Sequence, residues 1–333
     1  MKLTVEEAHH LSERTLIAAG YTQEEADKIT QHIMDTELRG LDYGGLARTL
    51  SVFERTTKHD YTRGPIKVVH ETPLSALVDG QNTIGYLVAR HASDLCIEKA
   101  SEHGMAVVGA RDTWHTGMLS FFAEMAAEHD LVTMIASNAA PNTAPYGGTE
   151  GRFGTNPICF GFPSTSNPVI WDIGTSNIMH GEVVLAERLG KTLPDGVAYD
   201  QDGKPTTDPT AALTGAYKSW GGHKGSGLAI AVQLLCTMCN VNPIPECMFG
   251  YGCLFVMMRA DLLMSAKEYK ENVAHYATEV RKTRPVEGGP TVRMPYDRSI
   301  ETRQSRIDAN EVEISDEVYE KLMKIAGLNS QSG

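Results

Sequence analysis

The order of its helix-like and strand-like patterns is what most constrains how this chain can fold. Apolar residues recur at helical spacing through the first sixty residues, whereas short apolar runs typical of strands alternate with helical patterns through the middle. This order predicts an α/β fold in which a mixed sheet is covered by helices and preceded by an N-terminal helical layer. The first expected strand is not followed by a GxGxxG motif, so the sequence carries no Rossmann fingerprint.

Helix boundaries are predicted from capping signals. Thr4 with Glu7, and Thr22 with Glu25, form two capping boxes that each open a helix. Further helices are expected after Gly44-Gly45 and at 84–103, 117–129, 178–190, 223–241, 266–283 and 316–326. Strands are expected within 65–80 and at 105–111, 131–137, 157–163, 168–173 and 252–258. We expect segment 191–222 to be loop, 284–298 to be extended, and 327–333 to be disordered.

Composition argues against two classes of partner. With a net charge of −12 over 333 residues, the chain offers no basic face for a nucleic-acid backbone. Its longest apolar run, 228–236, is too short to cross a bilayer, and the N-terminus has the pattern of an amphipathic helix and not of a signal peptide. We therefore expect a cytoplasmic protein with neither a nucleic-acid nor a membrane partner.

The six cysteines do not have the spacing of a metal site. Cys236 and Cys239 form a CxxC pair, but five residues separate Cys247 from Cys253 and no histidine lies close by. The expected state is therefore reduced, mostly buried thiols and no bound metal.

His115 is a candidate for proton transfer. It lies in the segment WHTG (114–117), between an expected strand and an expected helix. An imidazole on such a loop can reach a bound substrate, and it titrates near neutral pH. The alternative is a loop histidine that only makes a local hydrogen bond.

Other polar residues lie on loops next to expected strands, within the segments FGTNP (153–157) and WDIGTS (171–176). Amide and hydroxyl groups on such loops suit a carboxamide or carboxylate ligand, and turn formation alone is the alternative. The residues concerned are Asn138, Thr155, Asn156, Asp172, Thr175 and Ser176.

A phosphate site is expected where His223, Lys224 and Gly225 open the most apolar helix. The N–H groups of a helix N-terminus, together with a lysine, are suited to binding an anion. Gly225 and Gly227 would allow a ligand to approach the backbone closely. The alternative is a simple turn followed by a solvated lysine.

Five segments occur together in an order typical of one enzyme family. They are ELRGLDYGGLAR (37–48), WHTG (114–117), FGTNP (153–157), WDIGTS (171–176) and GGHKGSGL (221–228). From about residue 3 to 310, the chain resembles the malate/L-lactate dehydrogenase family that lacks a Rossmann fold. That family includes ureidoglycolate dehydrogenase, diketogulonate reductase and the piperideine- and pyrroline-carboxylate reductases.

The resemblance implies a non-Rossmann, mixed-sheet NAD(P)-binding fold and an intertwined homodimer. It also implies NADPH or NADH as the cofactor and a small-molecule carboxylate as the substrate. On this basis we expect a discontinuous helical, dimer-forming domain over 1–110 and 285–333, and an NAD(P)-binding domain over 111–284.

The resemblance also implies roles for individual residues. Arg48 lies where the family places the arginine that binds the substrate carboxylate through paired hydrogen bonds, although a surface helix arginine is the alternative. His115 matches a histidine that lines the active site. Substrate contacts are expected from Arg48, Asn138, Thr155 and Asn156. Cofactor contacts are expected from Asp172, Thr175, Ser176, His223, Lys224, Gly225 and Asp297.

Three places depart from the family pattern. Tyr43 and Gly44 stand where the family has Ser-His, whose histidine is the proton donor. Tyr43 is either a replacement acid, which would need activation because a phenol has a pKa of about 10, or a packing residue. Glu182 stands where lysine is usual, with His180 near it as a group that would offset part of the change in charge. The tripeptide PYD at 295–297 lacks the glycine of the family's PGE.

Three functions are open at this point. The first is an NAD(P)H-dependent oxidoreductase that reduces a small 2-oxo acid or cyclic 2-imino acid, with His115 or Tyr43 as the proton donor. The absence of the family histidine favours an imine, because a protonated iminium is already electrophilic. The second is a repurposed non-redox enzyme on the same fold, such as a cyclase or isomerase of an organic acid. The third is a dimeric binding protein without catalytic activity.

Overall fold

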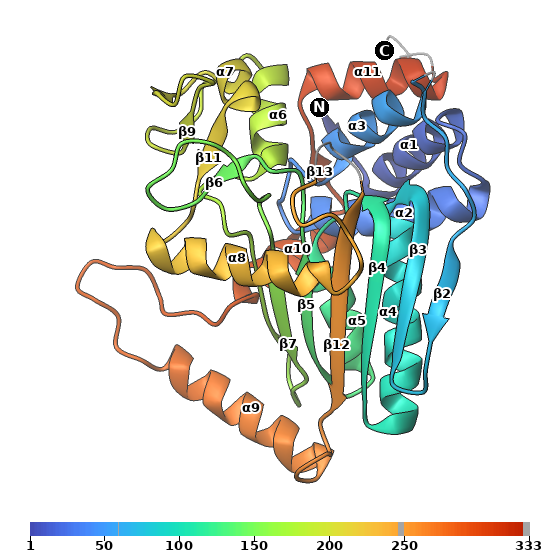
Figure 1. Ribbon diagram of the computed structural model, residues 1–333. Coiled ribbons are helices and arrows are strands. Elements are labelled where there is room, and N and C mark those ends of the chain that lie inside the picture. The colour runs from blue at the N-terminus through green and yellow to red at the C-terminus, as the bar shows by residue number, and fades with distance from the viewer. Residues whose placement is uncertain (59, 246–249, 329–333) are drawn as a thin grey trace. The chain divides into compact units, whose positions relative to one another are not determined.

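The computed structural model describes residues 1–58, 60–245 and 250–328, and the chain forms two compact units (Figure 1). The first unit comprises 1–63, 180–193 and the described chain from 299 onward, and the second comprises 64–179 and 194–298. These bounds differ from the expected division at 110 and 285, because strands between residues 67 and 114 pair into the sheet of the second unit. The expected division stays a prediction about functional domains.

The helices of the first unit begin where their caps predict. Thr4 and Thr22 cap α1 (Val5–Ala18) and α2 (Gln23–Leu38), and both capping boxes are confirmed. The sequence does not predict α10, because none of its side chains is buried and it therefore has no apolar stripe. The other elements are α3 (Leu46–Thr56), α6 (His180–Arg188), α10 (Asp297–Ala309, within this unit from Ser299), α11 (Asp316–Ala326), β1 (Lys2–Leu3) and β13 (Val312–Glu313).

A mixed sheet organises the second unit. Its seven strands lie in the order β2-β3-β4-β12-β5-β7-β8, with β3 and β4 parallel and the other neighbours antiparallel. The strands are β2 (Lys67–Glu71), β3 (Ser75–Ile84), β4 (Met105–Trp114), β5 (Leu131–Ser137), β7 (Ile158–Phe162), β8 (Val169–Ile173) and β12 (Tyr251–Arg259). The expected mixed α/β fold is confirmed, and each expected strand is present.

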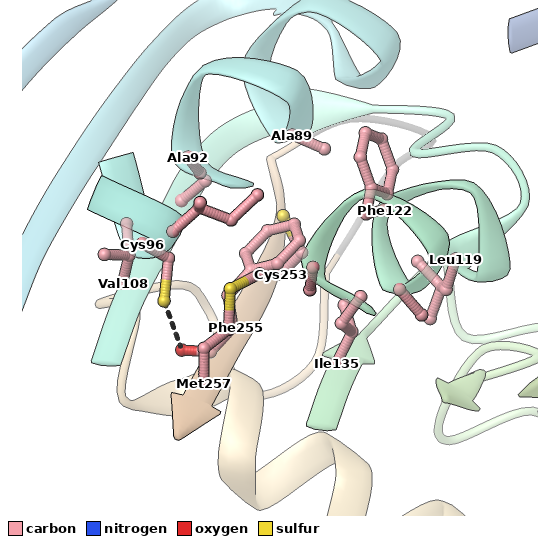
Figure 2. Packing of buried hydrophobic residues seen from close by; sticks show 14 of the residues in the cluster. Ala89, Ala92, Cys96, Val108, Leu119, Phe122, Ile135, Cys253, Phe255 and Met257 are labelled. Atoms are coloured by element: carbon pink, nitrogen blue, oxygen red, sulfur yellow. Dashed lines mark hydrogen bonds between the residues drawn. The ribbon is translucent and has the colours of Figure 1, made fainter. Parts of the chain in front are cut away.

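Helices cover both faces of this sheet. α4 (Gly85–His103) and α5 (Leu119–Glu128) pack on one face, and α8 (His223–Thr237) packs on the other (Figure 1). On the first face, Figure 2 shows the fully buried rings of Phe122 and Phe255, whose centroids lie 5.8 Å apart. Alternation along β5 places Ile135 in this cluster and Ala136 against α8. α9 (Ala266–Arg281) begins after the expected cap Ser265 and buries little of its surface.

The segment 191–222, expected to be loop, contains regular structure. It holds β9 (Ala198–Tyr199), β10 (Pro205–Thr206), α7 (Pro209–Thr214) and β11 (Ala216–Lys218). With β6 (Thr143–Ala144) these strands form a second sheet in the order β10-β9-β11-β6. The loop prediction was wrong because strands of two or three residues show no periodic pattern, and because β11 pairs with residues far away in the chain.

The cysteines of the described chain are free and buried, which confirms the expected thiols for Cys96, Cys159, Cys236, Cys239 and Cys253. Cys247 lies outside the described residues, as do residues 329–333 of the tail that we expected to be disordered. Within the described ranges, no group of three His, Cys, Asp or Glu residues could hold a metal ion. No helix in the same ranges is both long enough and apolar enough to cross a membrane.

Candidate active site

Strand directions bring the predicted polar residues of the second unit to one edge of the seven-stranded sheet. β4, β5 and β8 run in the same direction, because β12 is antiparallel to β4 and β5, and β7 is antiparallel to β5 and β8. The ends of these three strands therefore lie beside the starts of β7 and β12. The residues at this edge are His115 after β4, Asn138 after β5, Thr155 and Asn156 before β7, and Thr175 and Ser176 after β8.

Backbone hydrogen bonds join the loops at this edge. The Ser137 N–H donates to the Pro157 carbonyl (3.1 Å), and the Thr175 N–H donates to the Thr155 carbonyl (2.8 Å). The Trp220 N–H donates to the Thr175 carbonyl (2.8 Å) and ties the approach to α8 to the same loops. The predicted residues after β5, before β7 and after β8 are thus held together by the main chain.

The side-chain amides of the two asparagines differ in whether all their polar atoms have hydrogen-bond partners within the protein. The Nδ2 of fully buried Asn156 donates to the Ala229 carbonyl (3.0 Å) and to Gln233 Oε1 (2.9 Å), so this amide anchors its loop to α8. The Oδ1 of Asn138 accepts from the Gly252 N–H (2.7 Å), whereas its buried Nδ2 has no partner within the described part of the chain. A buried donor left unpaired costs about 1–3 kcal/mol, so Asn138 Nδ2 is suited to an acceptor on a ligand.

Three predicted cofactor residues bond to the protein through their side chains. Thr175 Oγ1 donates to two carbonyls of the loop before β7 (3.1 and 3.2 Å), and Ser176 Oγ donates to the Ile178 carbonyl (2.7 Å). Asp172 accepts from the Ser120 N–H (2.8 Å) in the first turn of α5, and burial raises the pKa of this carboxyl to about 6. These side chains shape the loops, and their contact with a cofactor stays a prediction.

The backbone of His115 is held in an uncommon conformation. Its φ of 49° lies in the left-handed region, which few residues other than glycine adopt and which is frequent at functional sites. The half-buried ring packs edge-to-face on Trp114, with centroids 5.5 Å apart. A Cβ at Gly85 would lie 2.8 Å from the His115 carbonyl oxygen, so α4 fits closely against this loop. The role of His115 in proton transfer stays a prediction.

The N-terminus of α8 has the groups that bind phosphate. Its cap, Gly222, has a φ of 62° and supplies no side chain to the first N–H groups of the helix. His223 and Lys224 are exposed at this end. Gly225 is buried, and a Cβ there would overlap the Trp220 carbonyl, so the backbone can pack tightly only with glycine. Exposed N–H groups and a lysine at one helix end fit a phosphate group.

Asp297, the last of the predicted cofactor residues, is engaged in local bonds. It forms two hydrogen bonds with Arg281 (2.7 and 2.8 Å), which lower the pKa of its carboxyl, and it accepts from the Met294 N–H (2.9 Å). These bonds join the end of α9 to the start of α10. A contact between Asp297 and a cofactor stays a prediction.

In the first unit, Tyr43 and Arg48 lie against the start of α6. A Cβ on Gly181 would overlap the Arg48 guanidinium and would lie 2.8 Å from Cδ2 of the Tyr43 ring, so both side chains contact this glycine. His180 precedes it, and burial, followed by the Arg48 charge, lowers the pKa of the imidazole from its usual 6.5 to about 4. His180 thus opens the helix whose next residue contacts Tyr43 and Arg48, whereas Glu182 is exposed.

Glu37 supports the start of α3, the helix that carries Arg48. Its buried Oε2 accepts from the Leu46 N–H (2.8 Å) at the start of α3, where the cap Gly45 has no side chain to offer. A Cβ on Gly45 would overlap the Glu37 carboxylate. Arg306 of α10 donates to the Glu37 carbonyl, and its Nη1 lies 3.5 Å from Oε1. Burial raises the pKa of Glu37 to about 7.

Comparison with known proteins identifies the family. Residues 3–323 match the malate/L-lactate dehydrogenase family. The chain belongs to this family. The L-sulfolactate dehydrogenase of Methanocaldococcus jannaschii is 32% identical over 321 residues, which cover 92% of each chain. The Delta(1)-pyrroline-2-carboxylate reductase of Ancylobacter novellus is 35% identical over 237 residues, which cover 71% of this chain and 70% of the reductase.

A solved structure supports the same conclusion. The crystal structure of a dehydrogenase from Sinorhizobium meliloti superposes with a TM-score of 0.89 at 27% identity and covers 98% of both chains. The resemblance drawn from the sequence motifs is therefore confirmed, and the protein is an oxidoreductase of the dehydrogenase and reductase type. Membership of this family implies a nicotinamide cofactor.

Sequence reasoning did not give Glu37 or His180 a role in the site. Glu37 lies within the motif ELRGLDYGGLAR, but its bond to the Leu46 N–H depends on how the loop between them folds back. From the sequence, His180 was noted only because it is near Glu182, and the Arg48 charge that acts on it comes from a residue over 130 positions away in the chain. Local patterns carry no signal for either contact.

Glu37→Gln is expected to reduce the pH dependence of stability. The carboxyl pKa is about 7 in the folded protein and about 4.5 otherwise, so the stability from protonated Glu37 is complete below about pH 4.5 and is lost as the pH rises through about 7. A shift of this size corresponds to at most about 3 kcal/mol. Urea unfolding between about pH 5 and 8 should therefore show a smaller loss of unfolding free energy in Glu37→Gln than in the wild type.

The matched control for this experiment is Glu320→Gln, because Glu320 is an exposed carboxylate on α11 of the same unit. Its pH profile should follow that of the wild type. A profile of Glu37→Gln that also follows the wild type would contradict the assignment.

Proposed function

We propose that the protein is an NAD(P)H-dependent reductase of a small 2-oxo acid or cyclic 2-imino acid. The two relatives support this substrate class, because sulfolactate and pyrroline-2-carboxylate both carry a carboxylate next to the carbon that is oxidised or reduced. The observation that carries the proposal is the Arg48 guanidinium, which lies against Gly181 at the start of α6. A carboxylate at this point meets a cation and the N–H groups of a helix N-terminus.

Residues of the second unit fit a nicotinamide dinucleotide, either NADPH or NADH. The uncapped start of α8 and the exposed Lys224 suit its phosphates, and the buried Nδ2 of Asn138 suits a carbonyl acceptor such as a carboxamide. When bound, the cofactor supplies the hydride for the C=O or C=N carbon. Thr155, Asn156 and Thr175 hold the loops of the proposed site in place through the bonds described above.

The reaction also needs a proton donor, because Gly44 stands where the family has its histidine. His115 and Tyr43 are the donors predicted from the sequence. Tyr43 lies against Gly181 together with Arg48, which supports its presence near a bound carboxylate. A cyclic imine needs less help from a donor than a ketone, so the loss of the histidine favours an imino acid as the native substrate.

A non-redox enzyme on the same fold is the second candidate. Two changes of side-chain chemistry favour it, namely Gly44 in place of the histidine and Glu182 in place of the lysine. Such an enzyme would use the same carboxylate site to cyclise or isomerise an organic acid. Whether NADPH binds separates the two candidates.

We also propose a non-Rossmann cofactor fold and a homodimer in the cytoplasm. The free, buried cysteines are in keeping with a reducing compartment. Three apolar side chains at four-residue spacing are exposed on α8 and at its C-cap: Ile230 (46%), Leu234 (62%) and the cap residue Met238 (68%). Burying them would favour association.

Lys224→Ala is expected to weaken NADPH binding by about 1–3 kcal/mol, which is about 5- to 150-fold in Kd, because it removes a charge-assisted hydrogen bond to phosphate. Fluorescence titration with NADPH measures the effect. Lys267→Ala, at an exposed position of α9, is the control and should bind like the wild type. Equal affinity in the two variants would remove Lys224 from the site, and a wild type that does not bind NADPH would favour the non-redox candidate.

Gly44→His is expected to raise the turnover of 2-oxo acids relative to Gly44→Ala. A Cβ at position 44 would lie 2.8 Å from the Thr36 methyl, so both variants carry the same crowding and only one carries an imidazole. A positioned acid or base contributes about 10²–10⁴ in rate. Steady-state assays with a panel of 2-oxo acids and cyclic imines measure the difference, and equal turnover in the pair would show that position 44 does not serve the reaction.

The protein is expected to be a dimer at micromolar concentration. The family resemblance implies a homodimer, and the exposed apolar residues of α8 offer surface for association. Static light scattering measures the mass directly, for which one chain contributes 36.3 kDa. A monomeric mass would contradict the proposed dimer.

A further inference from the structure

The first unit contains a cavity of about 310 Å³ that has no part in the proposed reaction. Its lining comes from α3, α6, α10, β13 and α11, and all the lining residues belong to this unit. Sites for small molecules enclose about 300–1,000 Å³, so this cavity is at the lower end of that range. It therefore has room for one small metabolite.

Part of the lining is apolar. Leu185 of α6 and Leu189, just beyond the end of that helix, lie four residues apart, and both are half-buried. Ile314 and Val318 line the cavity as members of the buried core of this unit. An apolar group placed among these side chains would remove leucine surface from water, which favours binding.

The rest of the lining carries both signs of charge. Lys191 and Glu313 are exposed, and neither side chain has a hydrogen bond or an ion pair within the described part of the chain. Asp42 lies 3.9 Å from Arg306 Nη2, which is beyond hydrogen-bond range. A ligand that carries both a carboxylate and an ammonium could pair with a cation and an anion of this lining. A ligand of one charge would leave the other sign unmatched.

The cavity shares two helices with the proposed carboxylate site. Ala47, which lines the cavity, directly precedes Arg48 on α3. α6 contributes Leu185 to the cavity and, one turn earlier, Gly181 to the contact with Arg48. A ligand in the cavity would contact both helices, and it would stabilise the arrangement in which Gly181 lies against the Arg48 guanidinium.

We propose that this cavity is a regulatory site for an apolar amino acid, which binds as a zwitterion and tightens the binding of a substrate carboxylate at Arg48. The apolar side chain lies against Leu185 and Leu189, the carboxylate pairs with Lys191, and the ammonium pairs with Glu313. The binding site is independent of the proposed function, whereas its effect on the reductase rests on that function. L-Leucine belongs to this class of ligand and serves as the probe.

Calorimetric titration with L-leucine tests the site and the class of ligand. NADPH and saturating oxamate, an unreactive analogue of a 2-oxo acid, are present, so leucine that binds does so away from the carboxylate site. 4-Methylpentanoate lacks the ammonium, 3-methylbutylamine lacks the carboxylate, and glycine lacks the apolar side chain. Each should bind at least about 10-fold more weakly than leucine. Equal affinity for any of the three would overturn the assigned class of ligand.

Variants of the lining locate the bound leucine. Leu189→Trp should reduce leucine binding below detection because the larger ring fills the cavity, and Leu189→Met, which conserves volume, should bind like the wild type. Lys191→Ala should weaken leucine binding about 10-fold, whereas Lys324→Ala, at an exposed position of α11 in the same unit, should not. Thermal midpoints show whether each variant is folded. Because Lys191 is exposed, its variant decides the matter if Leu189→Trp does not fold. Wild-type affinity in the folded variants of Leu189 and Lys191 would overturn the site.

Oxamate titrations with and without L-leucine measure the regulatory effect. Leucine should lower the Kd of oxamate at least about 5-fold, and oxamate should lower the Kd of leucine by the same factor, because coupling between two sites is reciprocal. Leu189→Met should show this coupling, and Leu189→Trp should bind oxamate without any response to leucine. Oxamate binding that leucine leaves unchanged or weakens would overturn the regulatory role.

The outcomes for the wild type separate this inference from the proposed function. A wild type that binds NADPH and oxamate but not leucine would overturn the inference and leave the reductase standing. A wild type that binds neither NADPH nor oxamate would overturn the proposed function, and the regulation of the carboxylate site with it. Leucine titration of the same variants without these two ligands would then still decide whether the cavity binds an amino acid.

Discussion

The pairing of β12 between β4 and β5 is the constraint on which the second unit depends. Because β12 is antiparallel to both neighbours, β4 and β5 point the same way and end at the same edge of the sheet. Gly252 closes this edge, since its N–H donates to the Asn138 side chain and its carbonyl accepts from the Asn138 N–H. Without this strand at the centre, the loops that carry His115 and Asn138 would not be held on adjoining positions.

In the first unit, the arrangement depends on the buried carboxyl group of Glu37. Glu37 supplies the cap that Gly45 lacks, and α3 then begins where Arg48 can lie across the first turn of α6. Burial raises the pKa of Glu37, whereas burial, followed by the Arg48 charge, lowers the pKa of His180. Both groups are held away from their preferred charge by packing, and such groups are common where chemistry takes place.

Most secondary structure of this chain was predictable because its signals are local. The capping boxes at Thr4 and Thr22, the apolar period of α4 and the apolar runs of β5 and β12 each lie within a few residues. The elements that the sequence did not predict lack such local signals. α10 buries no side chain and so has no stripe, and β11 takes its partner from β6, a segment distant in the sequence. A short stretch of sequence does not show which of its residues will be buried or which distant strand it will pair with.

The candidate site, too, was only partly predictable from the sequence. The sequence by itself determined which reactive groups the chain has and in what order, namely Arg48, His115 and Lys224, together with the loss of the imidazole at Gly44. Only the tertiary structure decided which groups meet. It set Gly181 against Arg48, and it left the buried Nδ2 of Asn138 without a partner within the described chain. The reason is physical: a side chain's identity is local, whereas its burial, its charge state and its neighbours depend on segments brought together only by folding.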